Sequence, residues 1–199
     1  MKQETTVGFM AVFAGVLLAT VTSVSAFHAA TGKGTYAVDP QVLAEFHFVV
    51  AKPRDTTPDL KPGLNFVQSE VARISGSKSF QTVMISTAID FTIPPESDET
   101  DERTVTIKGE MVSTIFLGAG EERQHFAEFV SFTAIGMDKQ TSKPDSDHFS
   151  LIVEYSASQK QGPLFESLGF GDCVGETCII TFEGRVKKGD IFVHTSGGD

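Results

Sequence analysis

Apolar and polar residues alternate with a period of two along most of this chain, and this pattern constrains the fold more than any other feature. In VLAEFHFVV, residues 42–50, Phe46 and Phe48 fall on one face while Glu45 and His47 fall on the other. Such alternation is typical of β-strands with one buried and one solvated face. It recurs in residues 64–71, 80–93, 104–116, 126–135, 148–155, 178–188 and 190–195.

Together with a short strand near Thr35 to Val38, these segments predict about eight to ten strands. The only helical signal is a single turn at Leu164 to Leu168. The predicted fold is therefore all-β: an antiparallel β-sandwich of jelly-roll type, with a closed β-barrel as the alternative. Both architectures need strands with one apolar face, so the alternation does not separate them.

The first 26 residues have the features of a secretory signal peptide. Lys2 precedes an uncharged stretch from Val7 to Leu18, and small residues end at Ala26, where we expect cleavage, with Ala30 as a fallback site. An uncleaved membrane anchor is the alternative, but hydroxyl side chains dilute the apolar end of the stretch. We therefore expect one domain over residues 27–199, exported to the periplasm or medium and not inserted in a membrane after cleavage.

The chain is acidic, with 26 Asp and Glu residues, 16 Lys and Arg residues and a net charge of −10. Proteins that bind nucleic acids or anionic lipid surfaces need a basic patch, so the balance argues against both partners. It suits a soluble protein, or one that meets cations.

Two cysteines, Cys173 and Cys178, have four residues between them in GDCVGETC. This spacing is wrong for a C-x-x-C redox motif, and a zinc site would need two further soft ligands nearby. In an exported chain an even number of cysteines predicts a disulfide, here one that closes a tight loop around Gly175. A reactive free thiol is the alternative.

Oxygen ligands for calcium occur in two acidic loops. In MDKQTSKPDSD the candidates are Asp138, Asp145 and Asp147, although the D-x-D-x-D-G pattern is missing and two lysines oppose the charge. The loop PPESDETDE is a second, weaker candidate, because solvated acidic loops between strands are common. Our expectation is therefore no cofactor, with calcium at the three aspartates as the alternative.

Signatures of common enzyme classes do not occur in the sequence. There is no G-x-S-x-G, H-E-x-x-H or phosphate-binding G-x-x-x-x-G-K motif. The histidines are scattered singly, at positions 28, 47, 125, 148 and 194. We expect a protein that is not an enzyme.

Two segments near the end of the chain carry a family resemblance. The run from Phe129 to Val153, and FEGRVKKGDIFVH from Phe182 to His194, resemble the tail of the small exported bacterial β-domains of the post-COAP type. The matching positions are Asp138, Pro144, Asp147, Phe149, Leu151, Gly184, Val186, Gly189, Ile191, Val193 and His194.

The stretch GLNFVQSEV, residues 63–71, extends this similarity, which covers about Thr35 to His194. It implies a compact β-domain attached to, or secreted beside, extracellular proteins, and it implies no known reaction. From the residues themselves, Gly189-Asp190 predicts a tight turn between two strands, and His194 is expected to be structural.

The resulting hypothesis is an exported, non-enzymatic interaction or accessory domain whose partner is an unidentified extracellular or periplasmic protein or surface. Polar loops on a rigid sheet scaffold are a common place for recognition. The rival hypothesis is a barrel that carries a small apolar ligand. Its lining would be Phe46, Phe48, Phe132, Phe149 and Phe182.

Overall fold

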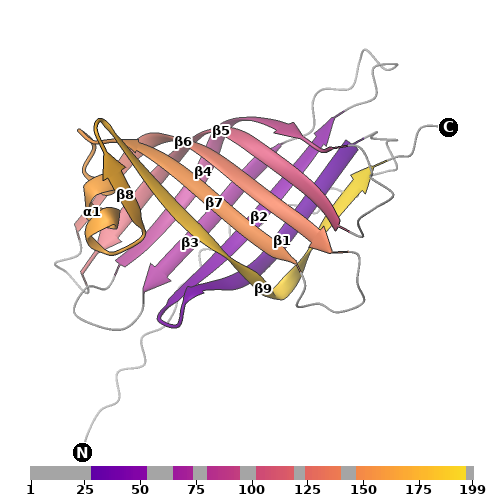
Figure 1. Cartoon of the computed structure of the whole chain (residues 1–199), viewed down its shortest axis with the longest axis horizontal. Coiled ribbons are helices and arrows are strands. Elements are labelled where there is room, and N and C mark those ends of the chain that lie inside the picture. The colour runs from indigo at the N-terminus through magenta and orange to yellow at the C-terminus, as the bar shows by residue number, and fades with distance from the viewer. Residues whose placement is uncertain are drawn as a thin grey trace, which may run out of the picture.

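The structure is a computed structural model that describes residues 28–52, 65–73, 80–94, 102–118, 124–139 and 147–195 (Figure 1). One helix, α1 (Gln161–Ser167), accompanies the strands. The strands are β1 (His28–Asp39), β2 (Val42–Lys52), β3 (Phe66–Arg73), β4 (Phe80–Thr92), β5 (Glu102–Leu117), β6 (Gln124–Lys139), β7 (His148–Ser156), β8 (Gly171–Val174) and β9 (Thr177–Thr195).

Each strand pairs antiparallel with its neighbour in the order β1-β2-β3-β4-β5-β6-β7-β9-β8, and β1 also pairs with β9. This last pairing closes all strands except β8 into a barrel, and β8 forms a hairpin with the start of β9. The all-β prediction is confirmed. Of the two architectures the closed barrel is the one observed, and the preference for a β-sandwich was wrong, because the β1–β9 pairing that closes the sheet leaves no mark on the alternation.

The strand β9 is longer than the sequence indicated, because it continues through the position where Gly189-Asp190 predicted a turn. Its first residues pair with β7 and β8, and the rest pairs with β1. Gly189 has a positive φ of 103°, and a Cβ atom there would lie 1.9 Å from the carbonyl oxygen of Lys33. Glycine therefore serves a close approach between β9 and β1, and the predicted turn is wrong.

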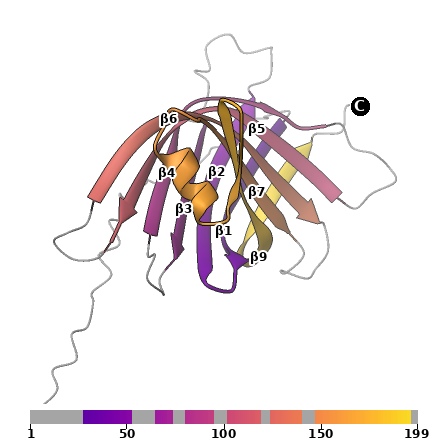
Figure 2. The ribbon, with the colours of Figure 1, turned by 60° about the vertical axis from the view of Figure 1, so that its left-hand side comes forward.

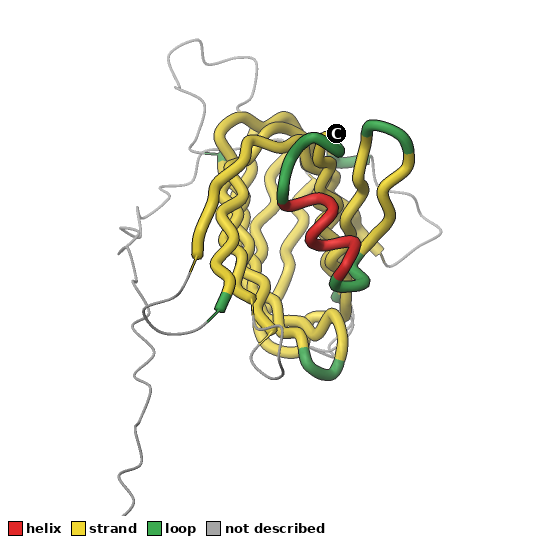
Figure 3. Tube along the Cα trace, turned by 90° about the vertical axis from the view of Figure 1, so that its left-hand side faces the viewer, coloured by secondary structure: helices red, strands yellow, loops and turns green. Residues whose placement is uncertain are grey.

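Figure 3 looks onto the end of the barrel that carries α1, with the helix lying in front of the ring of strands. Figure 2 shows the same helix and the β8 hairpin together at this end. Within the described residues, no helix has both the length and the apolar character needed to span a membrane. Residues 1–27 lie outside the described residues, so the signal-peptide prediction is not addressed there.

Candidate functional site

The lumen of the barrel is a candidate ligand site, because an eight-stranded barrel is just wide enough either to be filled by side chains or to hold one small ligand. Phe48 of β2 is fully buried and points inward. A Cβ atom placed on Gly136 of β6 would lie 3.0 Å from Cζ of Phe48. Since β2 and β6 lie on opposite sides of the barrel, this one ring crosses the lumen.

A stack of aromatic rings surrounds Phe48. The ring of Phe46 lies 4.2 Å from that of Phe149 on β7, with only 7° between the planes. Gly32 and Gly34 of β1 make room for the stack, because a Cβ atom at Gly32 would lie 2.3 Å from the Phe48 ring. The five phenylalanines expected to line a carrier are all buried. Three of them, Phe46, Phe48 and Phe149, stack on one another between β2 and β7.

Tyr36 of β1 completes this cluster, with its ring 5.7 Å from that of Phe149. Its hydroxyl is buried and has no hydrogen-bond partner of standard geometry among the described residues. The nearby Ser69 hydroxyl donates to the carbonyl oxygen of Glu45 at 3.0 Å. Burial raises the pKa of Tyr36 above its ordinary range, and Ser69 opposes this shift.

At the end of the lumen that carries α1, Phe165 of this helix is fully buried and fills the space between the strands. Its ring centroid lies 5.9 Å from that of Phe80 on β4 and 5.5 Å from that of Phe182 on β9. Because β4 and β9 face each other across the barrel, Phe165 spans this end as Phe48 spans the middle.

A buried polar network holds α1 to the wall. Gln161 accepts a hydrogen bond of 2.6 Å from the Ser113 hydroxyl, and its amide donates to the carbonyl oxygens of Ser113 and Phe126. The hydroxyl of Tyr155 lies 3.0 Å from that of Ser113. Each polar group of Gln161 therefore has a partner, as a buried network requires.

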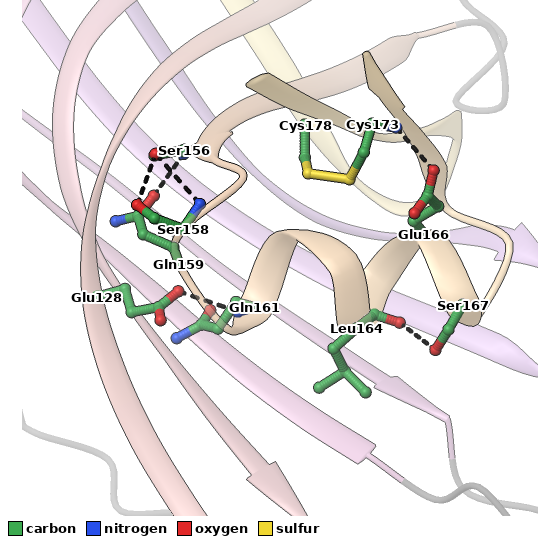
Figure 4. Close-up of a disulfide and its surroundings, with 10 residues drawn as sticks. All are labelled: Glu128, Ser156, Ser158, Gln159, Gln161, Leu164, Glu166, Ser167, Cys173 and Cys178. Atoms are coloured by element: carbon green, nitrogen blue, oxygen red, sulfur yellow. Dashed lines mark hydrogen bonds between the residues drawn. A yellow bond between two sulfur atoms is a disulfide. The ribbon is translucent and has the colours of Figure 1, made fainter. Parts of the chain in front are cut away.

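The N-terminus of α1 is capped from a distant strand (Figure 4). The carboxylate of Glu128 on β6 accepts hydrogen bonds from the backbone N–H groups of Lys160 (2.7 Å) and Gln161 (3.1 Å). A negative group at this position satisfies free N–H donors and favours the helix dipole. The helix is thus fixed at its first turn by β6.

The structure joins Cys173 and Cys178 in a disulfide between directly opposed residues of β8 and β9 (Figure 4). The hairpin turns at Gly175, whose φ is +62°, as a two-residue turn with glycine first requires. The Cys173 N–H donates to Glu166 of α1 at 2.9 Å. The disulfide therefore links the two strands of the hairpin that lies against α1.

Two of the three calcium candidates serve as acceptors for backbone groups of β9. Asp138 accepts from the Val193 N–H at 3.1 Å, and Asp147 accepts from the Ile191 N–H at 2.9 Å and the Lys139 N–H at 3.1 Å. Asp145 lies outside the described residues. Among the residues that are described, no group of three or more His, Cys, Asp or Glu side chains could hold a metal ion; calcium stays a prediction.

Asp147 also has an acidic neighbour that the sequence did not suggest. Asp190 accepts from the same Ile191 N–H at 3.0 Å. Burial and the hydrogen bond with the Asp190 carboxyl raise the pKa of Asp147 to about 6, while the N–H groups of Ile191 and Lys139 oppose the rise. The carboxyl group of Asp147 therefore holds its proton more tightly than an exposed aspartate does.

Among the described side chains, His47, His125, His148 and His194 lie singly on four different strands. The ring of His47 packs edge-on against that of Phe66, with 4.8 Å between the ring centroids. Burial lowers the pKa of His47, and the positive charge of Lys33 lowers it further. His125 lies near Phe116 on β5, and His194 near Phe192 on β9.

The outer face carries one feature that the alternation did not reveal. Ile85 of β4, Val112 of β5 and Phe129 of β6 stand in one register row. Ile85 is 50% exposed and Phe129 is 72% exposed. We call these three residues the outer patch. In the sequence, the outer patch is marked only by one apolar residue on the polar face of each of the three strands.

Comparison with protein-family models finds none that matches the chain, and searches of curated proteins and of solved structures return no significant match either. The post-COAP resemblance stays an expectation.

Proposed function

We propose that this protein is an exported, non-enzymatic interaction module that binds a protein partner through the outside of its barrel. The lumen serves as a rigid core. The rival is a carrier that holds an apolar ligand inside the barrel.

The observation that supports the proposal is the contact between Phe48 and Gly136 across the barrel. A carrier of this size needs a cavity of about 300 Å³ or more. The positions that would line it instead hold rings in mutual contact, and Phe165 plugs the end that carries α1. Export is supported by the disulfide, because such bonds persist in oxidising compartments.

Native mass spectrometry tests the proposal, with protein purified from its own host and then extracted with organic solvent. We expect the mass of the bare polypeptide and an extract without a stoichiometric compound. A lipid or other apolar molecule present in equal amount to the protein would overturn the proposal in favour of the carrier.

A further inference from the structure

The outer patch is bordered by carboxylates. Two residues along from Val112 and Phe129, the register row Glu110–Ser131–Glu154 runs across β5, β6 and β7. Its three side chains are exposed. Two residues of strand correspond to about 7 Å, and neighbouring strands lie about 4.8 Å apart. An apolar row therefore lies directly beside an acidic one on the same face.

Four of the described cations lie elsewhere on the barrel. Lys33, Arg185, Lys187 and Lys188 are exposed on β1 and β9, which lie outside the group of strands that forms the outer patch. The nearest cation on the patch strands is Lys108, which lies beyond Glu110 on β5 and pairs with Asp90 and Thr133 rather than with members of either row. The exposed Lys160, whose N–H bonds to Glu128 next to Phe129, is a further cation near the patch. The carboxylates of Glu110 and Glu154 therefore border the apolar row on the side of Ser131.

We propose that the outer patch, with Glu110 and Glu154, docks a segment of a partner protein that presents apolar side chains flanked by Lys or Arg. This inference rests on the proposed function and names its partner class. Exposed Phe129 supplies the apolar anchor, because aromatic residues carry much of the binding energy in protein interfaces. The two carboxylates supply charge complementarity, which steers association and selects a basic partner.

The charge selects this partner over the other occupants of an exposed apolar face. Anionic lipid surfaces are repelled by carboxylates at the point of contact. A second copy of this chain would place the same two carboxylates against themselves in an isologous interface, where like charges disfavour pairing.

The test uses the full mature protein and a synthetic amphipathic peptide of Leu and Lys, with a Leu and Glu peptide of the same pattern for comparison. Isothermal titration should detect binding of the Lys peptide only. Phe129→Ser should weaken it by about tenfold or more, and the pair Glu110→Gln and Glu154→Gln should weaken it by about fivefold and reduce its salt dependence.

Matched controls change the same chemistry elsewhere. Phe192→Ser alters another exposed phenylalanine, which is 51% exposed on β9. The pair Glu45→Gln and Glu183→Gln removes the same charge from β2 and β9. Both controls should bind the Lys peptide within about twofold of the wild type.

Equal weakening by the control pair would trace binding to net charge and overturn the proposal, as would an unchanged affinity in Phe129→Ser. The proposal would also be overturned if analytical ultracentrifugation found a dimer of the wild type and a monomer of Phe129→Ser, because a second copy of the chain would then cover the patch. These results are distinct from failure of the proposed function, which a compound in the solvent extract would reveal whatever the peptide does.

Discussion

Phe48 and Gly136 meet across the full width of the barrel, from β2 to the opposite strand β6. A side chain on Gly136 would have to share this space with the Phe48 ring and with Val105, whose Cγ1 atom would lie 3.1 Å from a new Cβ. The contact between these two residues distinguishes a lumen filled by side chains from one that could hold a ligand.

Substitution of Gly136 by valine tests whether the lumen is full. We expect Gly136→Val to lower the free energy of unfolding by about 1–3 kcal/mol, as overpacking does. Combining it with Phe48→Leu should cost less than the sum of the two single changes, because the smaller side chain frees space for the valine. Urea unfolding of the four proteins measures this. A Gly136→Val variant as stable as the wild type would indicate empty space beside Phe48.

A matched pair of tyrosines tests the hydrogen-bond assignments in the core. Tyr36→Phe should leave stability unchanged within about 0.5 kcal/mol or raise it, because its hydroxyl has no hydrogen-bond partner of standard geometry among the described residues. Tyr155→Phe should lower stability by about 1 kcal/mol, because its hydroxyl bonds to that of Ser113. Thermal and urea unfolding give both values. An equal loss in the two variants would mean that Ser69 does bond to Tyr36.

Removal of the disulfide should weaken the fold without abolishing it. The loop is short, with a sequence separation of 5, so loss of the cross-link in Cys173→Ser with Cys178→Ser should cost about 2 kcal/mol. The β8–β9 pairing and the Glu166 bond remain to hold the hairpin. Unfolding curves and a thiol-alkylation assay check this, with no reaction expected before reduction. An unfolded double variant at room temperature would contradict it.

The acidic pair at β9 predicts a pH effect with a definite sign. The pKa of Asp147 rises from 3.8 to about 6 in the fold, so the folded protein holds this proton more tightly than the unfolded chain does. The stability that it contributes is present below about pH 4 and is lost as the pH rises through about 6.

Asp190→Asn removes the second carboxyl group and should reduce the stability that is lost as the pH rises. The variant should therefore be more stable than the wild type at pH 7. Asp172→Asn, an exposed change of the same charge on β8, is the control. Urea unfolding between pH 4 and pH 7 measures the difference. Identical pH profiles for Asp190→Asn and the wild type would contradict the role of Asp190 in raising the pKa of Asp147.

The sequence predicted which side chains face inward better than it predicted how the sheet closes. Alternation placed Phe46 and Phe48 on one face, and both are buried. Closure depends on β1, whose apolar pattern is interrupted by Gly32 and Gly34. Glycine weakens a strand pattern because it has no side chain to pack, whereas in the fold these two residues make room for the Phe48 and Phe46 rings.

The outer patch could not be derived from the sequence for a different reason. Ile85, Val112 and Phe129 lie far apart along the chain and become neighbours only through the registers of β4, β5 and β6. The acidic pair has the same origin, because Asp190 reaches Asp147 only when β9 continues past Gly189. Register and strand length depend on the whole sheet, so a local pattern does not contain them.

The most direct test of the central claim is a fluorescence titration of the mature protein with phenylnaphthylamine, a neutral apolar probe. Phe48→Ala is the positive control, because it opens a cavity at a cost of about 3–5 kcal/mol, and Phe48→Leu serves if that variant does not fold. A filled lumen predicts no saturable binding by the wild type and new binding by the Phe48 variant. Saturable binding of one probe by the wild type, abolished in Gly136→Val, would contradict the account.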